Sequence, residues 1–452
     1  MADVICDERP LVFEDLVGWF SAGAKAKSEW RIGAEHEKFP FHLADHSPVP
    51  YEGPAGIHAL LQGLMRFGWT GVYEGETLIG LERAGANVSL EPGGQFELSG
   101  APLQDLHEIC AETGGHLTEV KAVADELGLG FLGLGFTPTW TRDQIPVMPK
   151  GRYKIMRAYM PKVGNLGLDM MFRTCTVQVN LDFGSEADMV KKFRTSLALQ
   201  PIATALFANS PFTEGRPNGF LSARANIWTD TDPDRTGMLD FVFRDGFEFA
   251  TYANYALDVP MYFVKREGRY IDVAGRSFRD FMEGRLPELP GERPTIKDWA
   301  DHVTTIFPEV RLKNYLEMRG ADAGPWSRLC ALPALWTGLL YDEAALEAAW
   351  DVCKDWSIES HEELRRDVTR LGLKAQAGKR PAQDVAREVV AIARQGLKAR
   401  NRLSGGMVDE TGYLAELEDI AETGITPAER LLDLYHGPWA GDLTKAYETL
   451  AF

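Results

Sequence analysis

The sequence has few basic residues relative to acidic ones. Its 48 lysines and arginines stand against 66 aspartates and glutamates, which gives a formal net charge of -18. Proteins that bind nucleic acid usually present a basic surface, so this balance argues against a nucleic-acid partner. No run of about 18 apolar residues occurs, and none of the first residues form a basic leader before an apolar stretch. From these absences we expect a cytoplasmic protein with no membrane segment that acts on small molecules.

Cysteines are also few, and the five present do not form a metal-binding pattern. None belongs to a CxxC pair or to a cysteine–histidine spacing, which argues against a structural zinc site and against a secreted disulfide framework. The GxxxxGK[ST] phosphate-binding loop is missing as well. Gly128, Gly130 and Gly133 spell GxGxxG, but a helix is predicted before them and a strand around them, which is not the order that a dinucleotide-binding turn needs. Any bound nucleotide must therefore be held by other residues.

The patterns that are present divide the chain unevenly. Strand-like alternation is concentrated in the first three quarters, whereas helical periodicity dominates from about residue 332 to the end. The two patterns do not alternate as βαβ units, so they favour an α+β fold with an antiparallel sheet. The length of 452 residues is typical of two domains but also fits one large core. We expect a single domain over residues 1–452 with a mostly helical C-terminal part.

Two segments carry pairs of glutamates at strand spacing. In IGAEHEKF, Glu35 and Glu37 are two residues apart, so on a strand both side chains point to the same face. In EPGGQFEL, Glu91 and Glu97 flank a Pro-Gly-Gly bend, and such irregularities re-aim side chains beside active sites. Carboxylate oxygens suit Mg²⁺, which favours hard oxygen ligands. A solvated strand face would explain either pair taken alone.

Two further predicted strands carry other polar groups. In YLEMRG, Glu317 and Arg319 share a face, and an acid beside a guanidinium suits a metal ion next to a phosphate. A surface ion pair is the plainer explanation of this spacing. In RTCTVQVNLDF, Thr176 and Gln178 belong to a neutral polar face that suits hydrogen bonds to an amino acid, although a solvent-facing sheet would alternate in the same way. The candidate magnesium ligands from all these strands are Glu35, Glu37, Glu91, Glu97 and Glu317.

Several stretches of a dozen residues or more resemble glutamate–cysteine ligases of the plant and proteobacterial type. The resemblance runs from about residue 30 to the C-terminus and includes MPKGRYKIMRAYMP, RTCTVQVNLDF and RLKNYLEMRGADAGPW. It implies a glutamine-synthetase-like ligase fold, in which a curved antiparallel sheet forms a funnel surrounded by helices. It also implies ATP and Mg²⁺ as cofactors. The implied reaction joins the γ-carboxylate of L-glutamate to the amine of L-cysteine through a γ-glutamyl phosphate, as the first step of glutathione biosynthesis.

The resemblance also implies roles for individual residues. The five glutamates match positions that line the Mg²⁺–ATP site of the family, and we expect Glu317 and Arg319 to be catalytic. Arg319 would stabilise the phosphoryl group in transfer. The residues expected to bind the amino-acid substrates are Arg152, Arg224, Tyr262, Thr176 and Gln178.

A pair of cysteines matches a regulatory disulfide of the family. These residues are Cys110 and Cys330, whereas the second cysteine pair of the plant enzymes falls on Val273 and Glu288. The missing pair argues against plant-style control by two disulfides and against redox-driven dimerisation. We expect a monomer or a weak homodimer.

Two other functions remain open from the sequence. The first is a related carboxylate–amine ligase that joins glutamate to a different amine acceptor, because the sequence does not identify the acceptor pocket. The second is a non-catalytic amino-acid-binding protein that kept the fold. The set of five glutamates and Arg319 argues against the second function, since binding alone does not need a multi-metal carboxylate cluster.

Overall fold

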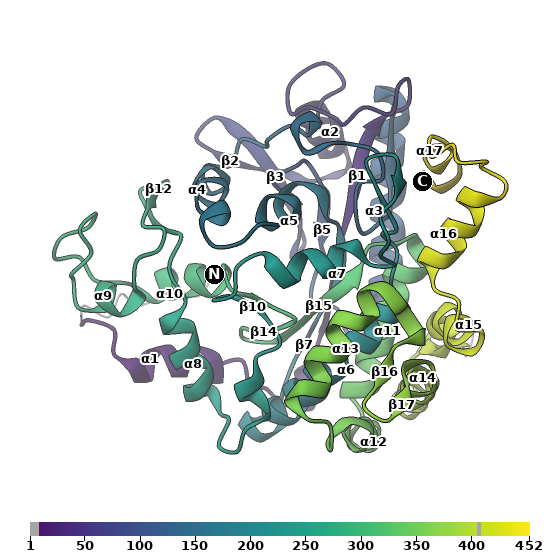
Figure 1. The fold of residues 1–452 in the computed structure, drawn as a ribbon. Coiled ribbons are helices and arrows are strands. Elements are labelled where there is room, and N and C mark those ends of the chain that lie inside the picture. Colours follow the sequence, from purple (N-terminus) through teal and green to yellow (C-terminus); the bar gives the residue numbers. More distant parts are fainter. Residues whose placement is uncertain (1–8, 405–407) are drawn as a thin grey trace.

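The central element of the fold is a nine-stranded sheet in which each pair of neighbouring strands runs antiparallel (Figure 1). The structure, a computed structural model, describes residues 9–404 and 408–452. Strand β6 (Leu129–Leu132) pairs with β1 beside the main path. Along that path the order is β14 (Val310–Leu312), β15 (Leu316–Asp322), β7 (Thr176–Leu181), β1 (Ile32–His42), β5 (Phe96–Ser99), β4 (Ala86–Leu90), β3 (Thr77–Arg83) and β2 (Thr70–Glu74). The predicted α+β fold with an antiparallel sheet is confirmed.

Helices surround the sheet and dominate the chain after β15. Before β15 they are α1 (Phe13–Ser21), α2 (Ile57–Leu64), α3 (Leu106–Leu127), α4 (Gly151–Tyr159), α5 (Gly167–Arg173), α6 (Glu186–Leu206), α7 (Ala223–Ile227), α8 (Phe249–Asp258), α9 (Phe278–Met282) and α10 (Ile296–Val303). After it come α11 (Trp326–Leu340), α12 (Glu343–Cys353), α13 (Ile358–Leu371), α14 (Ala382–Arg400), α15 (Ala415–Thr423), α16 (Pro427–His436) and α17 (Lys445–Leu450). No described helix is long and apolar enough to cross a membrane. The extent of one domain over the whole chain stays a prediction.

Short two-stranded ribbons lie outside the main sheet. They are β8 (Phe212–Thr213) with β9 (Arg216–Pro217), β11 (Phe263–Arg266) with β12 (Arg269–Asp272), β16 (Gln376–Ala377) with β17 (Arg380–Pro381), and β18 (Leu403–Ser404) with β19 (Val408–Asp409). One further ribbon, β10 (Thr236–Gly237) with β13 (Phe307–Pro308), is parallel. Strand β13 matters for the site, because it leads directly into β14.

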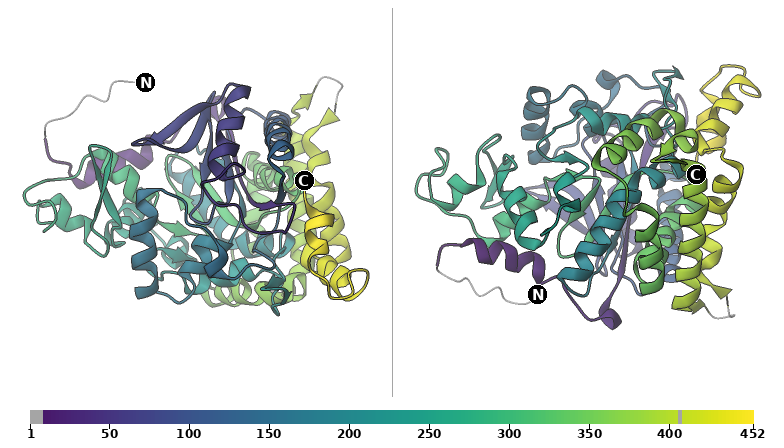
Figure 2. Two further views of the ribbon diagram at one scale, coloured as in Figure 1. Left: turned by 90° about the horizontal axis from the view of Figure 1, so that it is seen from above. Right: turned by 60° about the horizontal axis from the view of Figure 1, so that its bottom comes forward.

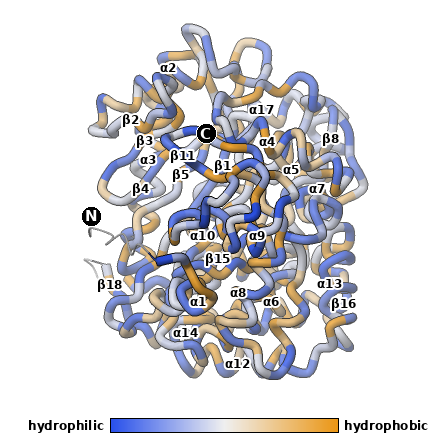
Figure 3. Tube along the Cα trace, turned by 90° about the vertical axis from the view of Figure 1, so that its left-hand side faces the viewer, coloured by the Kyte–Doolittle hydropathy of each residue, from blue (hydrophilic) through white to orange (hydrophobic). Residues whose placement is uncertain are grey.

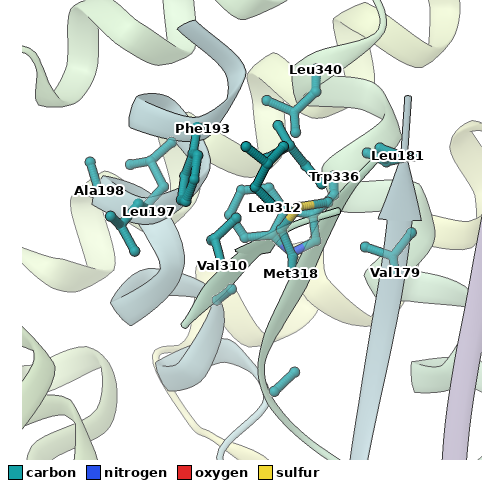
Figure 4. Packing of buried hydrophobic residues seen from close by; sticks show 14 of the residues in the cluster. Val179, Leu181, Phe193, Leu197, Ala198, Val310, Leu312, Met318, Trp336 and Leu340 are labelled. Carbon is teal, nitrogen blue, oxygen red and sulfur yellow. The ribbon is translucent and has the colours of Figure 1, made fainter. Parts of the chain in front are cut away.

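One face of the sheet is covered by α6 and α11, and this layer holds the larger hydrophobic core. Strand alternation sends Val179 and Leu181 of β7 to this face. They pack near Trp336 of α11, while Phe193 of α6 lies beside the apolar residues of β14 (Figure 4). Both helices are buried on nearly every side because α12, α13 and α14 cover them in turn. Figures 1 and 2 show the helices from α14 onward gathered on one side of the molecule.

Helices α11 and α14 approach each other unusually closely. A Cβ atom at Gly396 of α14 would lie 1.9 Å from the carbonyl oxygen of Gly338 in α11, so neither position tolerates a side chain. A second hydrophobic cluster fills the space between β2–β5 and the helices α2 and α3. Along the chain seen in Figure 3, hydrophobic residues alternate with hydrophilic ones, as amphipathic elements over a buried core require.

The GxGxxG pattern has a structural explanation. Gly128 ends α3 in the left-handed conformation, with φ of 68°. Gly133 lies against the backbone of Gly324, whose oxygen would be 2.5 Å from a Cβ atom at position 133. The strand predicted around this pattern covers only Leu129–Leu132. These glycines therefore serve chain reversal and close packing.

Candidate functional site

A cavity of about 490 Å³ opens on the face of the sheet that α6 and α11 leave free. Strand alternation brings polar side chains of β1, β5, β7 and β15 to this face, the opposite of the apolar set in the core. All five predicted glutamates line the cavity, as do Arg152, Arg224, Thr176, Gln178 and Arg319. Residues that are up to 284 positions apart in the sequence, from Glu35 to Arg319, thus meet in one hollow.

Three of these glutamates form a carboxylate group, which we define as Glu37, Glu91 and Glu97. Glu37 on β1 lies directly opposite Glu97 on β5 in the antiparallel register. Burial, reinforced by the negative charge of Glu91, raises the pKa of Glu97 to about 7 and places the pKa of Glu37 well above its ordinary value. Few hydrogen bonds compensate: Glu37 accepts one from the backbone N–H of Thr176 at 3.0 Å. The carboxylate group therefore has a strong need for positive charge.

Basic residues of α4 and α7 face the carboxylate group. Lys150 donates to the hydroxyl of Ser89 at 2.8 Å, and burial together with the nearby Arg152 lowers its pKa to about 8. The Nε atoms of Arg152 and Arg224 are buried and make no hydrogen bond within the described chain. Arg224 reaches the backbone carbonyl of Arg319 at 2.9 Å. Both guanidinium groups thus retain donors for an anionic ligand.

A second cluster, the hairpin group, is defined as Arg311, Lys313, Glu317 and Arg319 and comes from β14, β15 and their turn. Glu317 is fully buried and lies within 4 Å of three cations: Arg311 at 2.5 Å, Arg319 at 3.2 Å and Lys313 at 3.7 Å. Burial alone would raise the pKa of Glu317, but these three cations hold it well below its usual range. Glu35 lies between the two groups, and burial with the charges of Glu317 and Glu97 raises its pKa to about 7.

Strand β15 contains a bulge at the position of Arg319. Met318 pairs with Val179 and Ala321 pairs with Val177, so Arg319 and Gly320 together face the single residue Gln178. The carbonyl of Gly320 turns toward α6, where the hydroxyl of Thr204 donates to it at 2.9 Å. The side chain of Arg319 then donates to the Oε1 atom of Gln178 at 2.6 Å. The predicted shared face of Glu317 and Arg319 follows from strand alternation, and the bulge adds one residue after it that periodicity does not show.

The donor chemistry of the cavity fits Mg²⁺, although the described residues do not form a complete metal-binding site by themselves. In residues 9–404 and 408–452, no three His, Cys, Asp or Glu side chains converge closely enough to hold an ion by themselves. Mg²⁺ commonly takes one or two carboxylates and completes its shell with water or phosphate oxygens. Carboxylates that are buried together and raise one another's pKa match that need. The carboxylates of the cavity therefore fit a Mg²⁺ ion that binds together with a phosphate ligand.

Comparison with known proteins identifies the family. Residues 31–449 match the model of glutamate-cysteine ligase family 2 (GCS2). The chain belongs to this family. It is 58% identical over 451 residues to the chloroplastic glutamate–cysteine ligase of Medicago truncatula, an alignment that covers 100% of this chain and 87% of the relative. The corresponding Arabidopsis thaliana protein is 56% identical over 451 residues, with 100% and 85% covered. This GCS2 membership confirms the predicted ligase class.

A solved structure supports the fold of this GCS2 chain. The glutamate–cysteine ligase of Francisella tularensis, crystallised in complex with AMP, superposes with a TM-score of 0.53 at 12% identity. The superposition covers 93% of this chain and 87% of that one. The likeness shows a shared fold, which confirms the ligase-type α+β architecture.

The comparisons correct the expected location of this GCS2 protein. The relatives from M. truncatula, Nicotiana tabacum and A. thaliana are all named chloroplastic. The expectation of a cytoplasmic location is therefore wrong. It rested on the composition of the first residues of the sequence, and that composition is too weak a basis for a location.

Tyr262 is the predicted substrate-binding residue that the structure leaves outside the cavity. Its side chain is 1% exposed and packs on the guanidinium of Arg235 at 3.8 Å and against the ring of Tyr159. Its hydroxyl points to the sulfur of Met160 at 3.5 Å. The residue follows α8 in an apolar segment, and its aromatic ring packs within the second hydrophobic cluster.

Thr176, another predicted substrate-binding residue, lines the cavity, but its hydroxyl donates to the carbonyl of Ala321 at 2.8 Å.

Sequence reasoning missed the basic residues that neutralise the site. Arg311 and Lys313 line the cavity but were not singled out, and Lys150 was passed over within a basic segment. A signal for Arg311 was present. In RLKNYLE a short turn places Arg311 opposite Glu317 once the segment is folded as a hairpin.

The two predicted redox cysteines lie side by side. Cys110 of α3 and Cys330 of α11 are buried free thiols, and a hydrogen bond between them, with burial, raises the pKa of Cys110. The hydroxyl of Tyr413 also contacts Cys110. Val273 and Glu288 line one small surface hollow of about 280 Å³. The two positions where the resemblance places the second cysteine pair of the family thus line one hollow.

Proposed function

We propose that this chain joins the γ-carboxylate of L-glutamate to the amine of L-cysteine at the expense of ATP, which is the first step of glutathione biosynthesis. The single observation that carries the proposal is the cavity in which five glutamates face Arg152, Arg224 and Arg319. A carboxylate resists attack by an amine until ATP converts it to an acyl phosphate. A site for that chemistry needs both a place for phosphates and cations that neutralise them.

The proposed reaction has two steps. A γ-carboxylate oxygen of glutamate attacks the γ-phosphorus of ATP, an O–P bond forms, and the bond to ADP breaks. The amine of cysteine then attacks the acyl carbon, phosphate leaves, and the nitrogen loses a proton. Alignment of the reactants and neutralisation of charge are the main tasks of the protein in both steps.

The carboxylate group and Glu35 are proposed to hold Mg²⁺, with Glu317 beside them. When bound, Mg²⁺ supplies positive charge that neutralises the phosphate oxygens. Glu37, Glu91 and Glu97 supply the oxygens, and the raised pKa values of Glu37 and Glu97 reflect negative charge that is only partly compensated. An ATP complex that brings Mg²⁺ with it would relieve their mutual repulsion. AMP in the crystallised F. tularensis relative supports a nucleotide site in this fold.

Arg319, Arg152 and Arg224 are proposed to bind the anionic groups of the reactants. Arg319 is held by Gln178 and Glu317, so its guanidinium is ordered before a phosphoryl group arrives. The free Nε donors of Arg152 and Arg224 suit carboxylates of the amino acid. Because the Oε1 atom of Gln178 accepts from Arg319, its amide NH₂ is the group proposed to donate to a substrate.

The decisive experiment measures ADP release by the purified chain with glutamate, cysteine or both, together with mass detection of γ-glutamylcysteine. ADP release that requires both amino acids and yields this product is the expected result. Turnover with glutamate and another amine, but not cysteine, would favour the related ligase with a different acceptor. Binding of glutamate without any ATP turnover would favour a non-catalytic amino-acid-binding protein.

We also propose that Cys110 and Cys330 form a disulfide on oxidation that alters activity. Their burial side by side between α3 and α11 supports this pairing. Oxidation should change the activity of the wild-type chain and leave that of Cys110→Ser unchanged, and an equal response of both would refute the proposal. The oligomeric state, a monomer or weak homodimer, stays a prediction for analytical ultracentrifugation to test.

A further inference from the structure

Arg311 makes contacts that set it apart from the other cations of the cavity. It lies on β14 directly opposite Glu317 on β15, and its side chain is 7% exposed. Its Nε and Nη2 atoms donate to the two different carboxylate oxygens of Glu317, at 2.5 and 3.0 Å. This two-point contact fixes both the place and the rotation of the carboxylate.

The same guanidinium also binds the backbone of residues 304–307, a segment of the cavity wall that we call the rim. The Nη1 atom of Arg311 donates to the backbone carbonyls of Thr304 and Ile306, at 2.8 and 3.1 Å. Thr304, Thr305 and Phe307 line the cavity on either side of these carbonyls. One buried side chain thus connects a cavity carboxylate on the sheet to the backbone of this rim segment.

No other cation of the hairpin group can replace this contact. Arg319 approaches Glu317 at 3.2 Å and Lys313 at 3.7 Å, and neither forms a two-point contact. A carboxylate accepts about four hydrogen bonds, so the contact with Arg311 leaves oxygen lone pairs of Glu317 facing the cavity. Arg311 therefore fixes the carboxylate of Glu317 and still leaves acceptor positions on its oxygens for another ligand.

We propose that Arg311 is a positioning residue for the ligase reaction: it orients Glu317, and with it the rim, for the Mg²⁺–ATP complex. This role rests on the proposed function. It is distinct from substrate binding, because the described donors of Arg311 are already engaged with Glu317 and backbone carbonyls.

The test compares Arg311→Lys with Arg235→Lys. Arg235 is a matched control because it is also buried and also binds this rim, with Nη1 donating to the carbonyl of Thr305 at 3.0 Å. Its charge partner is Asp232 at 2.6 Å, and Asp232 lies outside the cavity. Both variants keep a cation but lose the planar fork of the guanidinium.

Arg311→Lys should lower kcat on the order of 10–100-fold, because small misplacements of catalytic groups carry effects of that size. Calorimetry should show weaker binding of Mg²⁺ with a non-hydrolysable ATP analogue. Arg235→Lys should lower thermal stability but keep kcat within about threefold of wild type, well below the effect of misplacing a catalytic group. Equal kcat losses in both variants would overturn the proposal, as would wild-type kcat in Arg311→Lys.

A double-mutant cycle separates positioning from general stability. If Arg311 acts through Glu317, then Arg311→Lys added to Glu317→Gln should cost little further activity. Losses that simply multiply would overturn the proposal. Should Arg311→Lys not fold, Arg311→Gln in the Glu317→Gln background removes the charges of both partners together and supports the same comparison.

The design also separates this proposal from the proposed function. Absence of γ-glutamylcysteine formation by the wild-type chain would refute the function alone. The calorimetric comparison of Arg311→Lys with Arg235→Lys would then still decide the positioning role, and equal binding by both variants would overturn it.

Discussion

The two charged clusters of the cavity handle negative charge in opposite ways. In the hairpin group, Glu317 has three cations within 4 Å and a lowered pKa. In the carboxylate group, Glu37 and Glu97 face each other and Glu91, and their pKa values are raised. Both clusters are buried on the same face of one sheet. The difference shows that burial alone does not decide the charge state of a carboxylate; its partners do.

This contrast suggests a division of labour. The hairpin group is balanced within the protein, so it can be rigid before any ligand binds. The carboxylate group is only partly balanced by Lys150, Arg152 and Arg224, so we expect it to bind further positive charge from outside. We therefore expect the two groups to respond differently to substitution, to Mg²⁺ and to pH.

The largest effect should be on turnover. Glu35→Gln and Glu317→Gln should each lower kcat on the order of 10²–10³-fold, because each removes a carboxylate proposed to hold the metal ion that neutralises the transferring phosphoryl group. Steady-state assays at saturating Mg²⁺ measure this loss. Near-normal kcat in Glu317→Gln would show that the hairpin group supplies no carboxylate needed for turnover, and would contradict the proposed division of labour.

Removing a carboxylate should change the free energy of unfolding in opposite directions in the two groups. Glu317→Gln leaves Arg311, Lys313 and Arg319 buried without their anion, and should lower the free energy of unfolding by about 3–5 kcal/mol. Glu37→Gln removes a repelled carboxylate and should keep or raise stability in the metal-free protein. Denaturant titrations with a chelator present measure both values. Equal losses in the two variants would contradict the contrast.

Mg²⁺ should stabilise the protein through the carboxylate group. At about 100 times its Kd, a ligand that binds only the folded state adds about 2.7 kcal/mol, which corresponds to a rise in Tm of about 2–5 °C for a chain of this size. The rise should be lost in Glu37→Gln and should persist in Arg235→Lys. Differential scanning calorimetry with a non-hydrolysable ATP analogue, in the presence of either Mg²⁺ or a chelator, provides the measurement. A full rise in Glu37→Gln would show that the ion binds elsewhere.

The smallest expected effect is the pH dependence of stability that comes from His361, a residue outside the cavity. Burial lowers the pKa of His361 from 6.5 to about 4, and its ring stacks on Phe243 at 4.4 Å. Between these pH values the unfolded chain binds a proton that the folded chain does not, so stability should fall as pH falls from about 6.5 to about 4. His361→Gln should remove on the order of 1–2 kcal/mol of this fall, measured by urea unfolding at pH 7 and pH 4.5. An unchanged pH profile would refute the assignment to His361.

Periodicity and residue chemistry anticipated the strands of the site well. Glu35 and Glu37 share a face because side chains alternate along a strand, and Gln178 follows the same rule on β7. The antiparallel sheet followed from the absence of βαβ alternation. Residues outside regular strands were predicted less well. Tyr262 was misplaced because its burial depends on Arg235 and Tyr159, which are distant in the sequence.

What the sequence by itself determined is the set of acidic side chains and their shared orientation on each strand, because both depend on local spacing along an extended backbone. What only the tertiary structure decided is which cation meets which carboxylate. The bulge at Arg319 and Gly320, the contact of Arg311 with Glu317, and the unbalanced charge of Glu37 and Glu97 all arise from the register between strands. Register depends on packing across the whole sheet, and electrostatic energies change steeply over the few ångströms that it sets.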